Sequence, residues 1–196
     1  MRASSPSAEE ASGSGRTGTL QAVHASWPEP VERVAGFLRE AGVEARLEEF
    51  GSGTPTARDA ARAAGCTLEQ IVKTLVLLCD DAPVVAMIPG DRRADLDKIA
   101  AAAGASKARI ASASEVKEIT GFAPGAVAPF PLPDVGRVFI DRTLLAHATV
   151  WIGAGSPAHI AAVRPPDLLR LSRAETIDAV LEPAYDAAVK GDPSHA

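Results

Sequence analysis

The stretch Ile71-Val-Lys-Thr-Leu-Val-Leu-Leu-Cys79, closely followed by Val84-Val-Ala-Met-Ile88, decides the fold of this chain. Both segments are short apolar runs, and the two aspartates and the proline between them are typical turn residues. The pattern therefore predicts a β-hairpin with one strand over 72–79 and a second over 84–88. A single lysine, Lys73, interrupts the first apolar run.

The residues before the hairpin predict two helices and one short strand. Four large apolar side chains recur at helical spacing over 29–41, and Gly42 ends that helix. A short strand is expected over 45–50, and an alanine- and arginine-rich helix over 56–64. Residues 68–71 predict one further helical turn just before the hairpin.

The residues after the hairpin predict a mixture of helices and closely spaced strands. Ser114 is expected to cap a short helix through its side chain. Residues 120–133 contain two glycines and four prolines, too many for a regular element. The remaining expected elements are strands over 137–141, 148–152 and 158–163, and helices over 94–103, 114–118, 165–169 and 175–180.

The fold class that follows is α+β, in one domain over 28–182. Short connections between the later strands favour antiparallel pairing, so we expect one mixed, mainly antiparallel sheet surrounded by helices. Residues 1–27 are rich in Ser, Gly, Ala and Glu, a composition that cannot support a core, and are expected to form a disordered tail. Residues 183–196 are expected to form a C-terminal tail.

Composition limits the kind of protein this is. The chain has 196 residues, 46% of them apolar but only 4% aromatic, so its core must be aliphatic. No apolar run is long enough for a membrane span, and the start lacks the apolar region of a secretory signal. Cys66 and Cys79 match no metal spacing and are expected to be reduced thiols, which predicts a cytoplasmic protein without a membrane partner.

The formal net charge of −5 argues against binding along a nucleic-acid backbone, because such proteins usually present a basic face. We therefore expect no DNA partner and no large RNA footprint. Contact with a nucleic-acid end remains compatible with the charge.

Lys73 is the first candidate functional residue. A lysine in an apolar strand either points to solvent from an exposed face or points into a cleft. In a cleft it would hold a phosphate, a carboxylate or a carbonyl oxygen.

Two glycine-containing segments are the next candidates. The loop Gly121-Phe-Ala-Pro-Gly-Ala-Val-Ala-Pro-Phe130 is either an ordinary structural loop or a rigid loop whose amides hold an oxyanion. Gly153-Ala-Gly155 has no obvious helix after it, so a phosphate-binding loop is a poor interpretation. Its glycines better fit a segment whose backbone a ligand can approach closely. His159 follows it and is either a structural histidine or part of a site. The chain shows no evident nucleophile, metal site or acid–base pair.

Four segments in this order resemble the YbaK/EbsC family, which includes aminoacyl-tRNA deacylases and the editing insertion of bacterial prolyl-tRNA synthetases. They are Ile71-Val-Lys-Thr-Leu75, Ile88-Pro-Gly-Asp-Arg-Arg93, Thr120-Gly-Phe-Ala-Pro-Gly-Ala-Val-Ala-Pro-Phe130 and Trp151-Ile-Gly-Ala-Gly-Ser-Pro157. The resemblance covers about residues 31–171. Family members often have a second glycine and a serine where this chain has Ala126 and Ala128.

The resemblance implies an enzyme that hydrolyses the ester of mischarged aminoacyl-tRNA with help from a ribose hydroxyl of the substrate. Lys73 and Gly125 would be catalytic, and neither a cofactor nor a metal is implied. The acceptor end of aminoacyl-tRNA would be the partner, with an aminoacyl-tRNA synthetase as a second one. The residues implied to bind substrate are Val72, Thr74, Ala126, Val127, Ala128, Pro129, Gly153, Gly155, Ser156 and His159.

The apolar residues of this set indicate selection by size, so alanyl, cysteinyl, seryl and threonyl esters are the expected substrates, with tRNA for proline as the family's common context. Two other functions stay open. One is a non-catalytic module of the same fold that binds a tRNA end, a synthetase or a small ligand. The other is an enzyme in which Lys73 forms a Schiff base with a carbonyl substrate.

Overall fold

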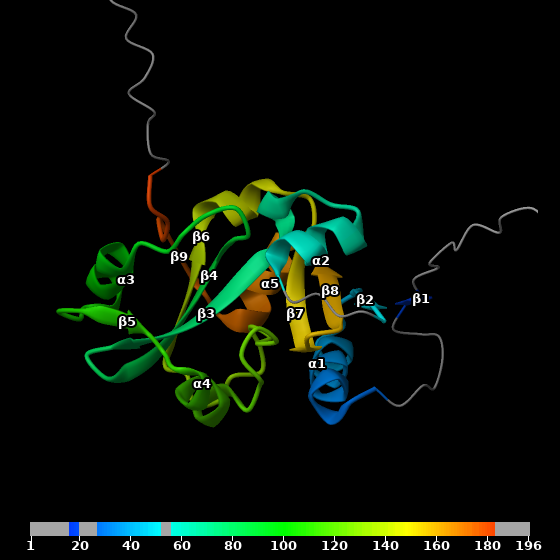
Figure 1. The fold of residues 1–196 in the computed structure, drawn as a ribbon, viewed down its shortest axis with the longest axis horizontal. Helices are drawn as coiled ribbons and strands as arrows, with labels where there is room; N and C mark the ends of the chain where they lie inside the picture. Colours follow the sequence, from blue (N-terminus) through cyan, green and yellow to red (C-terminus); the bar gives the residue numbers. More distant parts are fainter. Residues whose placement is uncertain (1–15, 20–26, 52–55, 183–196) are drawn as a thin grey trace, which may run out of the picture.

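The computed structural model describes residues 16–19, 27–51 and 56–182 (Figure 1). Its helices are α1 (Glu29–Glu40), α2 (Ala57–Ala64), α3 (Leu96–Ala103), α4 (Ala113–Thr120) and α5 (Pro165–Ser172), with 3-10 turns η1 (Leu68–Gln70) and η2 (Arg142–Ala146). Its strands are β1 (Arg16–Thr19), β2 (Arg46–Glu49), β3 (Val72–Cys79), β4 (Ala82–Pro89), β5 (Ala108–Ile110), β6 (Arg137–Asp141), β7 (Val150–Ser156), β8 (His159–Val163) and β9 (Glu175–Ile177). None of the helices in this described part is long and apolar enough to span a membrane.

The strands form two sheets where the sequence predicted one. The first has the order β1-β2-β8-β7 and is antiparallel throughout. The second has the order β5-β3-β4-β6-β9, in which the predicted β3–β4 hairpin is antiparallel and β6 pairs in parallel with both β4 and β9. The expected class, a single α+β domain with mainly antiparallel pairing and surrounding helices, is confirmed.

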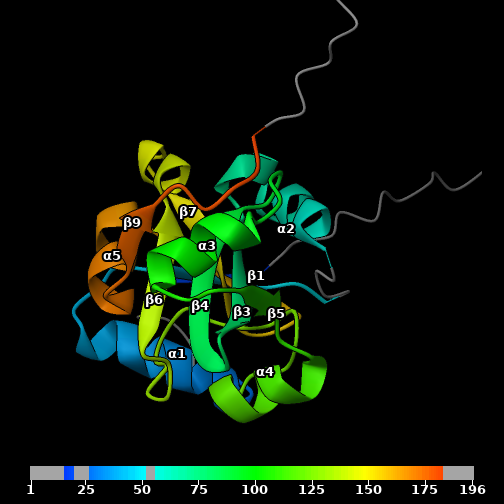
Figure 2. The same cartoon turned by 90° about the vertical axis from the view of Figure 1, so that its left-hand side faces the viewer.

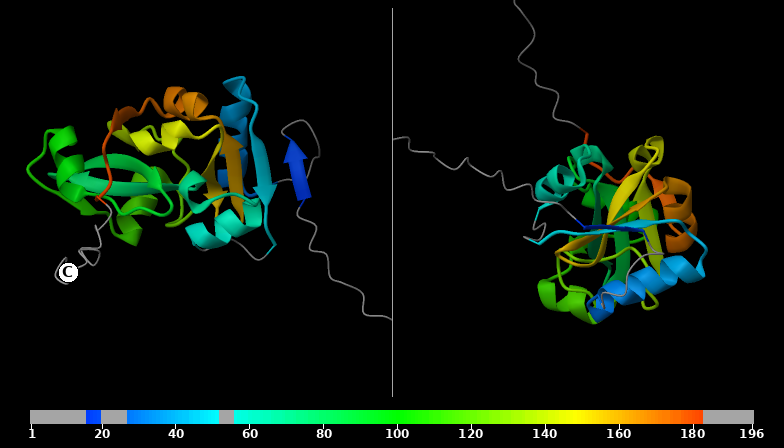
Figure 3. Two further views of the ribbon diagram at one scale, coloured as in Figure 1. Left: turned by 90° about the horizontal axis from the view of Figure 1, so that it is seen from above. Right: turned by 90° about the vertical axis from the view of Figure 1, so that its right-hand side faces the viewer.

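The two sheets meet at one point near the middle of the molecule, where β3 and β7 lie side by side (Figures 1 and 3). Ile71, just before β3, forms an isolated parallel bridge with Trp151 of β7. The bridge can form because β5 covers only residues 77–79 of β3, so the first half of that strand has a free edge. Lys73 belongs to this uncovered half.

The central hairpin is buried on both faces, which explains its almost uninterrupted apolar sequence. Alternation along the strands places Val76 and Val85 in the main core with α1, and Leu77 and Val84 in a second cluster under α3. Figure 2 shows α3 over one face of this sheet, and Figure 1 shows α1 towards the opposite end of the molecule. Helix α1 buries the apolar stripe that predicted it, including Val31, Val34 and Leu38.

Three sequence-based expectations about local structure are wrong. The helix expected over 175–180 is strand β9, because α5 ends at Arg173 in a left-handed conformation and the next residues pair with β6. Ser112, not Ser114, caps α4, because its hydroxyl and the Glu115 carboxylate form a reciprocal capping box. The strand expected over 148–152 continues to Ser156, with an irregular register between Gly153 and Ser156.

The segments predicted to be tails lie mostly outside the described residues. Within 1–27, however, β1 pairs with β2, and Trp27 packs partly buried against the main core. The folded part therefore begins earlier in the chain than residue 28. Figure 3 shows β1 at the outer edge of the four-stranded sheet.

Candidate active site

A cavity of about 290 Å³ lies where the two sheets meet. Its walls come from α2, the first half of β3, the loop around Gly125, strand β7 and the start of β8. Eight of the twelve residues predicted for the site line it, although they come from three separate parts of the sequence. They are Val72, Lys73, Thr74, Gly125, Val127, Gly153, Ser156 and His159.

Lys73 is held in this wall by a backbone contact. Its ammonium donates a hydrogen bond of 2.7 Å to the carbonyl oxygen of Arg92, in the turn after β4. Partial burial lowers the pKa of Lys73, and the charge of Arg93 lowers it further, while Asp91 acts in the opposite direction. The cation is thus poorly hydrated, which strengthens its interaction with an anionic or carbonyl oxygen.

Thr74 places a second polar group in the cavity wall next to Lys73. Its hydroxyl oxygen is buried and has no hydrogen-bond partner in the described part of the protein. A buried hydroxyl without a partner costs free energy, so a polar substrate atom that reached it would be favoured.

Gly125 turns the loop backbone towards the cavity. Its φ of +80° is in the left-handed region, where glycine is favoured, and open space surrounds the position of a Cβ. Gly153 lets strand β7 pack closely against this loop. A Cβ on Gly153 would lie 2.9 Å from the carbonyl oxygen of Val127, so only glycine lets β7 approach the loop so closely.

Four predicted substrate-binding residues do not line this cavity. Ala126 and Ala128 are 1% and 0% exposed, so they belong to the core. Pro129 lines a different cavity. Gly155 has a φ of +93°, and its Cβ position would lie 2.6 Å from the carbonyl oxygen of Pro30, so its small size serves the packing of α1.

His159 both lines the cavity and is buried, so the two interpretations of this residue are compatible. Its Nδ1 lies 2.6 Å from the Ser156 hydroxyl oxygen, which already accepts a hydrogen bond from the Ala158 amide. The ring tautomer decides which of the two groups donates, and Nε2 is buried without a hydrogen-bond partner in the described part of the chain. Burial lowers the pKa of His159, against the opposing charge of Glu49, so the ring is neutral at neutral pH.

Sequence reasoning missed the contribution of α2. Thr56, Ala57 and Ala60 line the cavity, and the spacing of the two alanines places them on one helical face. Trp151 also lines it, and the Arg46 guanidinium lies 4.9 Å from the centre of the Trp151 ring. Helical spacing could have identified Ala57 and Ala60 as a pair, but only the folded chain shows that they face Lys73 across a cavity.

The chemistry available here is that of a positioning site. The described walls offer one ammonium, three hydroxyls, a neutral imidazole and exposed backbone, with apolar side chains around them. No group of three or more His, Cys, Asp or Glu residues in the described ranges could hold a metal ion. Such a site can orient an ester and stabilise the oxygen on which negative charge develops.

Residues 52–171 match the family model described as an aminoacyl-tRNA editing domain. A crystal structure described as that of a candidate trans-editing enzyme for prolyl tRNA synthetase is 32% identical. It has a TM-score of 0.74 and covers 80% of this chain and 100% of its own chain.

Two curated relatives are longer proteins. The proline–tRNA ligase of Xanthomonas axonopodis pv. citri is 29% identical over 152 residues, which are 77% of this chain and 26% of the ligase. The proline–tRNA ligase of Maridesulfovibrio salexigens is 33% identical over 111 residues, 56% of this chain and 19% of the ligase. The chain therefore spans about a quarter or less of the length of these relatives.

Proposed function

Because the chain belongs to the family of aminoacyl-tRNA editing domains, we propose that it is an aminoacyl-tRNA deacylase that removes small amino acids from mischarged tRNA by substrate-assisted hydrolysis. One observation carries the proposal. The Lys73 ammonium and the Gly125 backbone line one cavity, and no triad of nucleophile, base and acid is evident in its described walls.

In the proposed reaction the protein positions the groups and the substrate supplies the base. The free hydroxyl of the terminal ribose takes a proton from water as the water oxygen attacks the ester carbonyl carbon. The bond from that carbon to the ribose oxygen then breaks, and the leaving oxygen takes the proton that the ribose hydroxyl received from water. Lys73 orients the carbonyl or the terminal phosphate, and the amides near Gly125 bind the carbonyl oxygen, a kind of contact that contributes about 2–4 kcal/mol.

The cavity walls support selection by size. The apolar part comes from Ala57, Ala60, Ile71, Trp151 and Ile160. A volume of about 290 Å³ must accept part of the terminal ribose as well as the amino acid. We therefore propose alanyl, cysteinyl, seryl and threonyl esters as substrates. The match to proline–tRNA ligases favours tRNA for proline as their carrier.

The acceptor end of aminoacyl-tRNA is the proposed partner, and an aminoacyl-tRNA synthetase is proposed as a second one. A single-stranded RNA end requires only a small contact area, which is compatible with the net charge of −5. Because aminoacyl-tRNA is made and used in translation, the proposed location is the cytoplasm.

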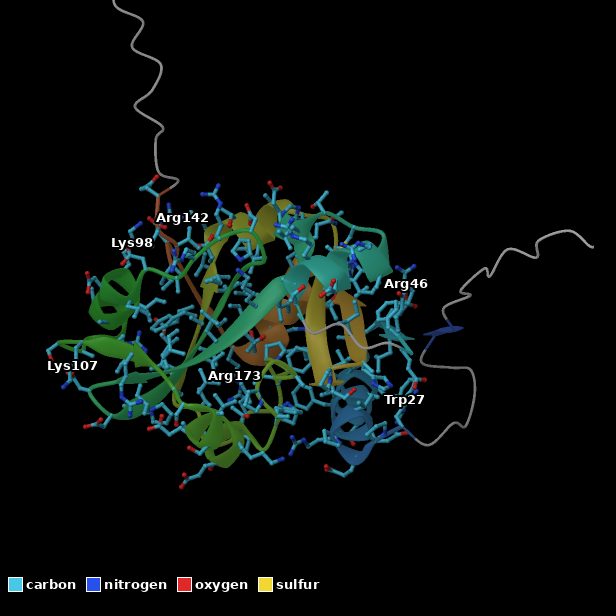
Figure 4. All side chains as sticks on the ribbon, viewed as in Figure 1. Trp27, Arg46, Lys98, Lys107, Arg142 and Arg173 are labelled. Carbon is cyan, nitrogen blue, oxygen red and sulfur yellow. The ribbon has the colours of Figure 1, made fainter. Side chains whose placement is uncertain are left out.

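A deacylation panel tests the proposal. Alanyl, seryl, cysteinyl, threonyl, leucyl and phenylalanyl esters of the same tRNA are incubated with the wild-type protein and with Lys73→Ala. The matched control is Lys107→Ala, because Lys107 is an exposed lysine at the far end of the five-stranded sheet (Figure 4). Equal turnover of all six esters, or full activity of Lys73→Ala, would contradict the proposal.

The lowered pKa of Lys73 favours one alternative function, a Schiff-base enzyme acting on a carbonyl compound. In that chemistry the neutral amine attacks the carbonyl and water leaves. Borohydride would then trap the adduct on Lys73 of the wild-type protein, whereas a deacylase would show no such mass increase. The two functions are thus separable by mass spectrometry.

A further inference from the structure

A second cavity, of about 520 Å³, lies apart from the candidate active site. It is formed by α1, the proline-containing segment 129–138, the end of α5 and the start of β9. None of the residues that line it also lines the cavity around Lys73. Its volume is in the usual range for small-ligand sites.

Most of its lining is apolar and rigid. Phe37 of α1 stacks on Phe130, with ring centres 5.3 Å apart, and Pro129, Pro131 and Pro133 of the same segment as Phe130 also line the cavity. Proline fixes its own backbone angle, so this wall is formed before any ligand binds. The shape and the lining of the cavity suit the aromatic or aliphatic part of a ligand.

Three arginines line the same cavity, and two of them have no acidic partner. Arg137 is neutralised because its Nε and Nη2 donate to the Glu175 carboxylate. Arg33 and Arg173 form no ion pair with any residue of the described ranges. Glu175 is the only acidic residue in the lining. The cavity therefore has a net positive charge that the protein itself does not balance.

Arg33 is the better fixed of the two unpaired cations. Its guanidinium lies over the Phe122 ring, with Cζ 4.3 Å from the ring centre, and packs against Gly121. Its Nε and Nη2 are buried without a hydrogen-bond partner in the described part of the chain. Lys117 donates to the Gly121 carbonyl oxygen and adds a second positive charge at this corner. These contacts hold the guanidinium in place beside the cavity, and no acidic residue of the described ranges balances its charge.

We propose that this second cavity binds a small molecule with one anionic group on an aromatic or aliphatic body. Arg33 and Arg173 would contact the carboxylate or phosphate, and Phe37 with the prolines would contact the apolar part. The charge argues for an anion and the apolar walls argue against a fully hydrated one, such as free inorganic phosphate. This inference does not depend on the proposed deacylase function.

Titrations followed by nuclear magnetic resonance of ¹⁵N-labelled protein test the proposal with defined probes. The probes are 4-phenylbutyrate, phenyl phosphate, the neutral isostere 4-phenylbutanol, and inorganic phosphate. We expect saturable shifts in segment 129–138 and at the Arg33 side chain with one or both aromatic anions. Comparing the affinities for 4-phenylbutyrate and phenyl phosphate shows whether the site prefers a carboxylate or a phosphate. Affinity for 4-phenylbutanol should be at least several-fold lower than for the better anion.

Variants identify the contacts. Arg173→Gly is the informative change, because glycine suits the left-handed φ of +52° at this position and the fold should survive. It should weaken binding of the anion several-fold, and Arg33→Gln should do the same. The matched control is Arg142→Ala, an exposed arginine on another part of the surface (Figure 4). If Arg142→Ala lowered the affinity as much as Arg173→Gly does, the effect would be one of overall charge and the proposal would be wrong.

Three other outcomes would overturn it as well. They are equal binding of 4-phenylbutanol and the anions, shifts confined to the residues around Lys73, and the absence of any saturable shift at millimolar concentrations of both aromatic anions. Because Arg33 also packs on Phe122, Arg33→Gln is interpreted only if its amide spectrum remains that of a folded protein. Arg173→Gly decides the question in either case.

Discussion

The ammonium of Lys73 and the carbonyl oxygen of Arg92 are joined by a hydrogen bond of 2.7 Å. This contact ties the first half of β3 to the turn after β4 and fixes where the positive charge lies. It also leaves two of the three ammonium hydrogens for other acceptors, since the ammonium has three donors.

Lys73→Ala should lower kcat/KM for seryl or alanyl ester hydrolysis by a factor of roughly 30–1000, equivalent to about 2–4 kcal/mol. The reason is the loss of a poorly hydrated cation that contacts the ester or phosphate oxygen. Single-turnover deacylation measures it. Lys73→Arg should recover little activity, because the longer, planar guanidinium cannot form the hydrogen bond to the Arg92 carbonyl and the substrate contact at the same time. An unchanged rate in Lys73→Ala would remove this residue from the mechanism.

A tRNA whose terminal ribose carries hydrogen in place of the free hydroxyl should bind but not be hydrolysed. In the proposed mechanism the substrate supplies the proton acceptor, because Nδ1 of His159 is engaged with the Ser156 hydroxyl and Nε2 is buried. Binding of the deoxy substrate is measured by competition against the normal one. Rapid hydrolysis of the deoxy substrate would point to His159 and Ser156 as a missed catalytic pair.

Gly153→Ala should reduce activity and lower the melting temperature, because its Cβ would lie 2.9 Å from the Val127 carbonyl oxygen and push the loop away from β7. Overpacking of this kind costs typically about 1–3 kcal/mol. Thermal unfolding and deacylation rates measure the two effects. Gly36→Ala is the matched control, since nothing lies within 4 Å of its Cβ position in α1. That change should stabilise the helix by up to about 1 kcal/mol and leave the rate unchanged.

Ala60→Leu should sharpen selection against larger amino acids. Ala60 is 5% exposed and lines the cavity, so a larger side chain there removes space that the substrate would use. We expect threonyl ester hydrolysis to fall several-fold more than alanyl ester hydrolysis, because one methyl group is worth about 1–3 kcal/mol in an apolar pocket. Ala63→Leu, on the exposed face of α2, is the control. Parallel loss of both activities would mean that Ala60 does not contact the amino acid.

The buried His159 should make the protein less stable in acid. Its pKa in the folded state lies below its ordinary value of 6.5, so folding favours the neutral ring. Stability from this residue is complete above pH 6.5 and is lost as the pH falls from there towards the folded-state pKa. Melting temperatures measured over this range should fall more steeply for the wild type than for His159→Gln. Identical slopes would show that the ring is accessible to protons in the folded state.

Most of the local structure could be predicted because it depends on neighbours in the sequence. The apolar runs of β3 and β4, the apolar stripe of α1 and the glycines that end α2 and α3 all act over a few residues. The errors occurred where a distant partner decided the outcome. Residues 175–177 became a strand because β6 offered a free edge and Arg137 held Glu175 in place.

The family, the class of fold and the two residues proposed for catalysis can be inferred without a structure, because the motifs around Lys73 and Gly125 are short and local. Their surroundings depend on contacts between distant residues. Lys73 faces a cavity because β5 is too short to cover the first half of β3, a fact about pairing lengths and not about local pattern. Likewise, Gly155 packs on Pro30 and Ala60 faces the site because residues far apart in the chain come together there. Local periodicity shows which face of an element is apolar, but only the folded chain determines whether that face meets the core or a ligand.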